Sequence, residues 1–453
     1  MRRWNSTVRG DGEGVSRKRQ RTDNGRYREM AHHVERNLRD SGEGLQRGRM
    51  FQSMTATQQV EIVHLAHTYF PSDVRVKREA TAAAATGHAV GVVALRGAGE
   101  APEEVIGPLQ VVRLPGAKSR SGPVRYLAEY LAFVWRCRRL LATDARFQHV
   151  RIVHVHTLPD FLVWAATPAR RRGARVILDL HEIFPEFVLA KYPGLVGRLA
   201  SSIAGAVERQ ARRRADVTIT VNRPIAELLA TRNPRRPGGE RIVLVHNSAD
   251  PGELGPLSAP DGRVITDRLA LIYHGTLTHL YGLDVAIRGV ALASREGAQV
   301  HFSILGDGPE RIALMKLVRD LGVAGTITFE DPIPARSLRE RLSRADAGIV
   351  PTRLDAMTRF SLSNKLLEYV HLGVPVLAAS LPSYAAYLRN DAAWFWTPGD
   401  PESLARVITQ FAETPAGERR VRAAQAQADV KDIAWDRERD RLIATYELLL
   451  AEG

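Results

Sequence analysis

Two runs of short apolar segments alternating with amphipathic helical patterns constrain the fold of this 453-residue chain more than any other feature. The first run lies within residues 58–250 and the second within residues 269–433. A strand, a helix and a second strand at this spacing form a βαβ unit, whose strands pair in parallel. We therefore predict an α/β protein with two doubly wound, Rossmann-like domains that face each other across a cleft.

The segments outside these runs differ in composition. Residues 251–268 are rich in Pro, Gly and Asp, so they are predicted to link the domains. Residues 434–453 have the pattern of a charged amphipathic helix. Residues 1–57 contain few branched aliphatic residues and are expected to stay disordered. This extension is interpreted as a basic tail, a solvated linker or, as we prefer, sequence upstream of a start at Met50 or Met54.

Charge and composition narrow the functional classes. The formal net charge is +14, and residues 1–53 hold 13 Arg and Lys against 7 Asp and Glu, which leaves +8 for the rest. Acidic small molecules, anionic lipid surfaces and nucleic acid are all compatible with this charge. The single cysteine, Cys137, excludes an internal disulfide and fits a reducing compartment. No apolar run reaches the ~20 residues that span a bilayer, so we expect a cytoplasmic protein.

A long helix is predicted over residues 124–141, with aromatic residues on one side and Arg136, Arg138 and Arg139 near its end. One interpretation places it on an anionic membrane surface. The other, which we favour, is a core-facing helix whose basic last turn complements the helix dipole.

The segment from Ser363 to Ala379 is predicted to form a short helix, a turn at Gly373 and a buried strand. Lys365 and Glu368 lie three residues apart near the start of this helix. Free N–H groups and a lysine can hold phosphate, and a carboxylate can accept hydrogen bonds from ribose hydroxyls. The alternative is a solvated ion pair on an ordinary helix.

Histidines follow two predicted strands of the first domain. His154 and His156 lie two apart, so both point to one face if their strand, predicted over residues 150–155, continues. The sequence places no third ligand beside them, so we expect a core residue in His154 and a functional loop residue in His156. His181 and Glu182 follow the strand at residues 176–180, at the sheet edge where open α/β sheets bind ligands.

Several enzyme classes lack support in the sequence. Gly306 and Gly308 are not followed by the third glycine of a dinucleotide fingerprint. The chain contains no P-loop motif and no Gly-x-Ser-x-Gly nucleophile elbow. It also lacks an Asp-x-Asp pair that would hold a metal on a sugar diphosphate, so we expect no metal and no other cofactor.

The motifs taken in order resemble those of a known family. They are Asp73-Val-Arg-Val-Lys-Arg-Glu-Ala80, His154-Val-His156, His181-Glu182, Gly275-Thr-Leu277, Leu305-Gly-Asp-Gly-Pro309, Ala345-Asp-Ala-Gly-Ile-Val-Pro351 and Lys365-Leu-Leu-Glu-Tyr369, closed by Trp435 and Tyr446. In their order and spacing, residues 58–450 resemble the retaining glycosyltransferases of family four, which have the GT-B fold.

The resemblance implies a nucleotide sugar, UDP- or GDP-linked, bound by the second domain, and a helix after Trp435 that returns to the first. His156, Lys365 and Glu368 would be the catalytic positions, with His156 beside the transferred sugar and Glu368 on the ribose. The positions expected to contact the donor are Asp73, Arg75, Gly275, Thr276, Gly306, Gly308, Pro332, Ile333, Arg359 and Ser363.

Three positions depart from the family pattern. Phe360 stands where the family has a glutamate, and Thr276 and Tyr281 stand where it has an arginine and a lysine. Lys365, Arg359 or Arg75 would then neutralise the leaving diphosphate.

The resemblance implies transfer to a glycan or lipid-linked acceptor with retained configuration, in cell-surface polysaccharide or glycolipid synthesis. Contact with the inner face of the plasma membrane is compatible with this activity, and nucleic acid is not expected as a partner. The alternatives are a nucleotide-sugar epimerase of the same fold and a weak or inactive basic binding protein.

Overall fold

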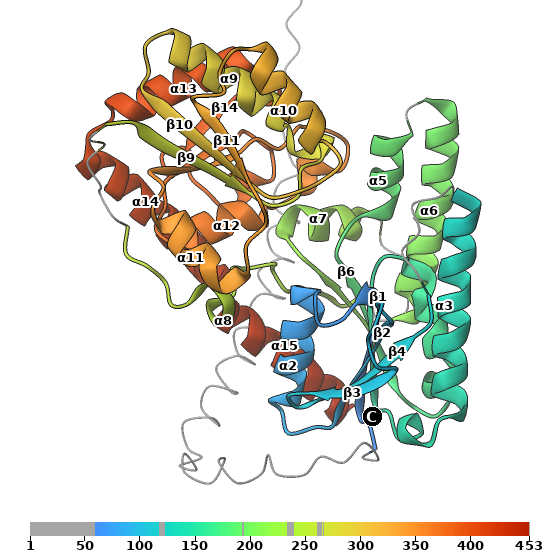
Figure 1. Ribbon diagram of the computed structural model, residues 1–453. Helices are drawn as coiled ribbons and strands as arrows, with labels where there is room; N and C mark the ends of the chain where they lie inside the picture. The colour runs from blue at the N-terminus through green and yellow to red at the C-terminus, as the bar shows by residue number, and fades with distance from the viewer. Residues whose placement is uncertain are drawn as a thin grey trace, which may run out of the picture.

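The computed structural model describes residues 59–116, 123–192, 194–232, 240–260, 265 and 267–452. These residues form two sheets, one parallel throughout and one parallel except for an edge strand, each covered by helices on both faces (Figure 1). The two doubly wound domains predicted from the alternating pattern are therefore present. The predicted disordered extension, residues 1–57, lies outside the described residues.

The first sheet has the strand order β3-β4-β2-β1-β5-β6-β7-β8. Its strands are β1 (Ile62–Tyr69), β2 (Val90–Leu95), β3 (Glu103–Ile106), β4 (Leu109–Leu114), β5 (Ile152–His156), β6 (Arg175–Leu180), β7 (Val217–Thr220) and β8 (Ile242–Leu244). All neighbours pair in parallel except β3, which is antiparallel to β4. The prediction of a wholly parallel sheet missed this edge strand, because β3 is short, largely exposed and without an apolar run.

Helices cover both faces of the first sheet. One face is covered by α2 (Val74–Ala84) and by α15 (Trp435–Ala451), which crosses back from the second domain (Figure 1). The other face is covered mainly by α3 (Pro123–Thr143), η3 (Asp160–Ala166) and α6 (Leu195–Arg214). The shorter elements are η2 (Ala145–Phe147), α4 (Thr167–Arg171), α5 (Phe184–Lys191) and α7 (Arg223–Thr231). The returning helix implied by the family resemblance is thus confirmed.

The second sheet has the order β11-β10-β9-β12-β13-β14, with every pair parallel. Its strands are β9 (Leu269–His274), β10 (Val300–Leu305), β11 (Ile327–Glu330), β12 (Ala347–Val350), β13 (Val376–Ala379) and β14 (Trp394–Trp396). The predicted strand after Gly373 is β13, and it is not the last strand of the sheet. The three residues of β14 extend the edge, and so short a strand gives little periodic signal.

Helices on the two faces of the second sheet pack in separate apolar clusters. One face carries α9 (Leu283–Arg295), α10 (Arg311–Asp320) and α13 (Pro401–Glu413), and the other carries α11 (Ala335–Ser343), α12 (Asn364–His371) and α14 (Ala416–Val430). Short 3-10 turns are η4 (His279–Tyr281), η5 (Thr358–Phe360), η6 (Tyr384–Ala386) and η7 (Lys431–Ile433). No helix in the described part of the chain is both long and apolar enough to cross a membrane.

The predicted linker, residues 251–268, begins with a short helix, α8 (Pro251–Leu254). The side chain of Asp250 accepts a hydrogen bond from the N–H of Gly252, and the proline occupies the first helical position, as N-terminal capping favours. Leu254 is buried in the second domain, and Arg339 donates a 2.6 Å hydrogen bond to its carbonyl. The first turn of the predicted linker is therefore helical and packs on the second domain.

The domains touch directly beside the cleft. Asn222 donates a 2.8 Å hydrogen bond to the carbonyl of Phe360, whose ring packs against the core of the first domain. The hydroxyl of Tyr387 accepts from the N–H of Arg223 at 2.5 Å and lies 2.9 Å from Nε2 of His246. The phenylalanine that replaces the family glutamate thus contributes to domain contact.

Candidate active site

A cavity of about 630 Å³ lies between the two domains. Its lining includes Thr68, Tyr69, Ser72, Asp73, Val74, Arg75, Arg78, His181, Glu182, Asn247, Ser248, Asp250, Glu253, Leu254, Leu338, Asn364 and Glu368. Of the predicted site residues, the cavity brings together Asp73, Arg75 and Glu368 from the two domains. Its volume falls in the range of small-molecule sites, about 300–1,000 Å³.

On the second domain, the predicted lysine lies against the turn that follows β9. Gly275 has φ = 120°, and a Cβ there would come within 2.6 Å of Cε of Lys365, so the close approach requires glycine. The Lys365 ammonium lies 3.9 Å from the ring centroid of Tyr281 and 5.3 Å from that of Tyr273. Burial lowers the pKa of Lys365 to about 8, against the opposing effect of Glu368. This aromatic cage holds a cation at the start of α12.

Glu368 lies one turn along α12 and carries a fixed negative charge. Its Oε2 atom is 3.0 Å from Nε2 of His274, the last residue of β9. Burial alone would raise the pKa of Glu368, but His274 and then Lys365 lower it below its ordinary value. The carboxylate therefore stays ionised at neutral pH and can accept hydrogen bonds from ligand hydroxyls.

The predicted glycines pack against a neighbouring loop. Gly306 has φ = 149°, and a Cβ there would lie 1.9 Å from the carbonyl oxygen of Gly275. A Cβ on Gly308 would lie 2.3 Å from the carbonyl oxygen of Leu277. Both are required by contact between the loops that follow β9 and β10, whereas the sequence prediction attributed them to close approach of the chain to the donor. Thr276 is exposed on the first of these loops.

The other predicted donor contacts do not line the inter-domain cavity. Pro332 and Ile333 follow β11 in an extended loop. Arg359 is exposed on η5, with its guanidinium 5.3 Å from the ring centroid of Phe360. Ser363 is the N-cap residue of α12 without a capping hydrogen bond from its side chain. They stay predictions as donor contacts.

On the first domain, strand register gathers a set of buried polar side chains. His64 of β1 pairs with His154 of β5, and His156 pairs with Asp179 of β6. Because side chains alternate along a strand, these groups share one face of the sheet, beneath α2 and α15. Glu79 of α2 completes the group.

Ion pairs and hydrogen bonds connect this buried group. Arg75 lies 2.8 Å from Oδ1 of Asp179 and 3.0 Å from Oε1 of Glu79. His154 lies 2.7 Å from the hydroxyl of Tyr446 on α15, and His156 lies 3.1 Å from Oδ2 of Asp179. The network therefore ties the returning helix to the strand ends beneath the cleft.

Burial and charge set the protonation of the network. Burial lowers the pKa of His156 to about 3, and it also lowers that of His154, so both rings are neutral. Burial would raise the pKa of Asp179, but Arg75 and then His181 lower it well below its usual range. Burial raises the pKa of Glu79 to about 8, Arg75 opposes the rise and Asp179 adds to it.

The structure corrects the prediction for His156. It is the last residue of β5, 2% exposed, and it does not line the cavity, so it is not a loop residue open to the cleft. His181 lines the cavity instead, with Nε2 2.8 Å from Oδ2 of Asp179 and 3.2 Å from Nδ1 of His156. The sequence signal was its place directly after β6, where a polar residue meets the ligand edge of the sheet.

The sequence could not place a third metal ligand beside His154 and His156, and the structure brings three further candidates to this pair. Among the described residues, Glu79, His154, His156 and Asp179 offer ligand atoms within 4.8 Å of one another, and so do His64, His154 and His156. This composition suits zinc. However, Arg75 already places a cation against both carboxylates, and a divalent ion would be repelled by it. The group is therefore better described as a charge-neutral hydrogen-bonded network.

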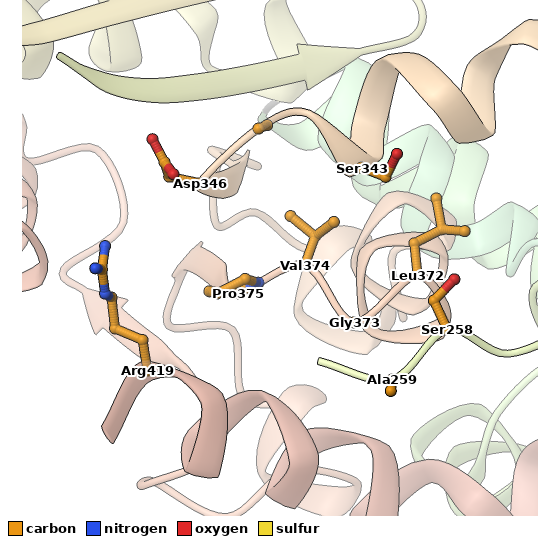
Figure 2. Close-up of a pocket in the computed structure, with 10 residues that line it drawn as sticks. Ser258, Ala259, Ser343, Asp346, Leu372, Gly373, Val374, Pro375 and Arg419 are labelled. Atoms are coloured by element: carbon orange, nitrogen blue, oxygen red, sulfur yellow. The ribbon is translucent and has the colours of Figure 1, made fainter. Parts of the chain in front are cut away.

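A second cavity, of about 260 Å³, lies at the opposite edge of the second sheet. Figure 2 shows Asp346 and Arg419 on one side of it, with Leu372 to Pro375 and Ser258 on the other. Asp346 precedes β12 and Pro375 precedes β13, so this cavity is at the amino ends of the strands. Ligands of open parallel sheets bind at the carboxyl ends, and the inter-domain cavity is therefore the candidate active site.

Two Rossmann-like domains, a cleft between them and a last helix that returns to the first domain define a protein with the GT-B fold. The sequence matches the model described as Glycosyltransferase Family 4 over residues 72–253 and that described as Glycosyl transferases group 1 over residues 268–414. The chain belongs to the family-4 glycosyltransferases.

Curated relatives are similar over part of their length. A D-inositol 3-phosphate glycosyltransferase of Streptomyces scabiei is 27% identical over 64% of this chain and 66% of that protein. A GDP-mannose-dependent alpha-(1-6)-phosphatidylinositol monomannoside mannosyltransferase of Mycolicibacterium smegmatis is 27% identical over 50% of this chain and 60% of that protein. The chain thus matches less than two thirds of the length of these relatives.

Solved structures share the fold at low sequence identity. Sucrose-phosphate synthase of Thermosynechococcus elongatus has a TM-score of 0.68 at 17% identity, covering 87% of this chain and 100% of that chain. Anabaena Alr3699/HepE in complex with UDP-glucose has a TM-score of 0.62 at 14% identity, covering 86% of this chain and 100% of that chain. These similarities establish the GT-B architecture.

Proposed function

We propose that this protein transfers a sugar from a nucleoside diphosphate sugar to a glycan or lipid-linked acceptor with retained anomeric configuration. The observation that carries the proposal is an inter-domain cavity lined by Glu368 from one side and by Asp73 and His181 from the other. A donor bound along α12 would present its sugar to the first domain.

The leaving diphosphate requires positive charge as the glycosidic bond breaks. Lys365 and the N–H groups at the start of α12 are the donors available on this side. One such preorganised donor typically contributes about 3–4 kcal/mol to transition-state stabilisation. In front-side displacement the leaving phosphate accepts the proton of the acceptor hydroxyl, so no side-chain base is needed.

His181 is the proposed positioning residue of the acceptor side. Asp179 holds its Nε2 atom at 2.8 Å, and Arg75 in turn holds Asp179, so the imidazole is fixed at the cavity wall. A fixed imidazole can hydrogen-bond to a sugar hydroxyl and orient the reacting carbon. In this role it replaces His156, which sequence reasoning placed beside the transferred sugar.

The proposal includes the nucleotide of the donor and the kind of biosynthesis in which the transfer takes place. The Anabaena structures were solved with UDP and UDP-glucose, and the mycobacterial relative is named for GDP-mannose, which supports a UDP- or GDP-sugar. A relative named for lipopolysaccharide biosynthesis and another for a phosphatidylinositol mannoside support cell-surface polysaccharide or glycolipid synthesis.

Metal independence is proposed because the donor side offers a lysine and backbone N–H groups in place of paired carboxylates. The expected result is that dialysis against EDTA leaves the transfer rate within about twofold of its initial value. Recovery of a lost activity by Mg²⁺ or Mn²⁺ would contradict this part of the proposal.

The test of the donor site is a thermal-shift panel of UDP, GDP, ADP and their sugars on the full chain. A ligand at 100 times its dissociation constant stabilises the folded state by about 2.7 kcal/mol, which raises the melting temperature. We expect a shift with one nucleotide that is lost in Glu368→Ala and kept in Glu402→Ala, an exposed glutamate on α13. No shift with any nucleotide would favour the basic binding protein instead, and NMR of the product would decide between retention and inversion.

A further inference from the structure

The outer surface of α3 carries an exposed apolar stripe. Leu127, Leu131 and Trp135 are spaced four residues apart and are 50–58% exposed, whereas Phe133 and Cys137 of the same helix are buried. Residues four apart lie on one face of a helix. The helix is therefore apolar on both faces, which a helix that only covers a sheet does not need.

A second stripe lies on α6. Leu195, Leu199 and Ile203 repeat the spacing of four, and with Val196 they are 60–82% exposed. Together the two stripes account for nearly half of the large apolar residues exposed on the described part of the chain. Exposed apolar residues gathered in this way mark an interaction surface.

The two helices are neighbours on one face of the first domain. Both pack on η3, where Arg138 of α3 donates a 3.3 Å hydrogen bond to the carbonyl of Trp164 and Arg214 of α6 stacks on its ring at 5.1 Å. Figure 1 shows α3 and α6 together on the side away from α2 and α15. We call the exposed surface of α3 and α6 the outer face.

The stripes lie near the cleft. Crossover helices run opposite to the strands they connect, so α3 and α6 both begin at the carboxyl edge of the first sheet. Residues 195–203 fall in the first half of α6, and residues 127–135 span the middle of α3. The apolar end of the outer face is thus on the same side of the sheet as the opening of the candidate active site.

The outer face is also strongly basic. The two helices contain nine arginines and two glutamates, which gives them a net charge of +7. For comparison, all residues after residue 53 together carry a net charge of +8. One glutamate, Glu129, pairs with Arg125 at 3.2 Å, and the other, Glu208, is buried beside Arg212. The exposed charges at the surface, such as Arg198, are therefore predominantly positive.

We propose that the outer face docks on an anionic lipid bilayer, with the apolar stripes in the interfacial layer and the arginines on lipid phosphates. An amphipathic surface of arginines beside leucine and tryptophan has the composition of interfacial membrane-binding helices. Binding to a second copy of the chain would bring two surfaces of charge +7 together. Binding to a nucleic acid would leave the apolar stripes in water. An anionic bilayer fits both the positive charge and the apolar stripes.

This inference deepens the proposed function and rests on it for one step, the entry of a lipid-linked acceptor. Docking through the stripes brings the opening of the inter-domain cavity to the bilayer surface. An acceptor anchored in the membrane could then place its hydroxyl beside His181 without leaving the lipid. Membrane binding itself does not depend on that step.

The test is co-sedimentation of the full chain with vesicles. We expect binding to phosphatidylcholine vesicles that contain about 30% phosphatidylglycerol, and at least about tenfold weaker binding without the anionic lipid or at high salt. The double variant Leu199→Asp/Ile203→Asp should lose binding at least about tenfold, because it places charge in an apolar layer. The control is Ile312→Asp, at an even more exposed residue on α10 of the second domain, and this variant should bind like the parent.

Other results would overturn the inference. Equal binding by the double variant and the parent would show that the stripes do not enter the membrane. A second result would be that the parent binds neither kind of vesicle but forms dimers, and that the double variant does not form them. That result would identify the outer face as a contact between copies of the chain. The nucleotide shift, measured on the same variants, separates the two proposals: vesicle binding without any nucleotide shift would refute the donor site and leave the docking face standing.

Discussion

The two buried carboxyl groups beneath the cleft, those of Asp179 and Glu79, differ in how far their charge is compensated by neighbouring groups. Asp179 is fully buried and receives a guanidinium and two imidazoles, so its charge is compensated. Glu79 is equally buried but shares Arg75 with Asp179, and its pKa of about 8 keeps it mostly protonated at neutral pH. One carboxyl of the pair is therefore charged and the other neutral, as expected for like charges in a common buried site.

Substituting each carboxyl group in turn should distinguish the charged Asp179 from the neutral Glu79. Asp179→Asn leaves Arg75 buried without its carboxylate and should lower the free energy of unfolding by about 3–5 kcal/mol. Glu79→Gln mimics the protonated side chain and should not lower it at pH 7, because the parent must hold a proton on Glu79 there to fold. Urea denaturation of both variants measures the difference, and equal losses would contradict this assignment of protonation states.

The same pair predicts a pH dependence of stability. The folded-state pKa of Glu79 is raised to about 8, so its contribution to stability is complete at low pH and is lost as the pH rises toward 8. Glu79→Gln removes that loss, and its stability relative to the parent should increase between about pH 5 and pH 8 by at most about 1.4 kcal/mol per pH unit. Melting temperatures of both proteins across this range provide the measurement.

Lys365 gives a pH dependence of activity. Its pKa of about 8 means that the ammonium is lost as the pH rises through this value, so kcat/KM for the nucleotide sugar should fall above about pH 8. Lys365→Arg keeps a cation at high pH and should move the fall upward if the larger side chain fits between Tyr273 and Tyr281. Lys365→Met should lower kcat/KM about 100-fold or more at every pH. A profile that falls at the same pH in Lys365→Met would assign the titration to another group.

At the scale of elements, α15 belongs to the core of the first domain although it follows the second in sequence. Trp435, Leu442, Tyr446 and Leu449 are buried against α2 and the first sheet. Leu442→Ala should therefore lower the free energy of unfolding by about 2–5 kcal/mol, through lost burial and a new cavity. The exposed residue Glu447 on the same helix gives the control, because Glu447→Ala should stay within about 0.5 kcal/mol. Equal, small effects would show that α15 is only loosely docked.

At the scale of the whole molecule, direct contacts between the domains determine how the two halves of the site face each other. The hydroxyl of Tyr387 joins the N–H of Arg223 and the ring of His246, and Tyr387→Phe leaves both without this partner, at a cost of about 1–3 kcal/mol. Nucleotide affinity should stay within about twofold, because the donor groups lie on one domain, while kcat should fall. Isothermal titration and transfer kinetics make this comparison, and a parallel loss of nucleotide affinity would contradict it.

Local periodicity was sufficient to predict most of the architecture. Alternating strand and helix patterns gave two doubly wound domains, and the segment around Lys365 and Glu368 was predicted as the helix, turn and strand that are observed. It was insufficient for β3, β14 and α8, because each is four residues or shorter, which is too short for a helix or strand period to be recognised.

The sequence by itself determined that Lys365 and Glu368 lie together, since both are on one helix and their spacing fixes their common face. Only the tertiary structure decided which residues of the first domain line the candidate site. His64, Asp179 and Tyr446 meet because strand register and the return of α15 bring together positions up to 382 residues apart. The same register buries His156 and leaves His181 at the cavity. Local patterns specify which way a side chain points within its element, but which strands are neighbours depends on the packing of the whole chain.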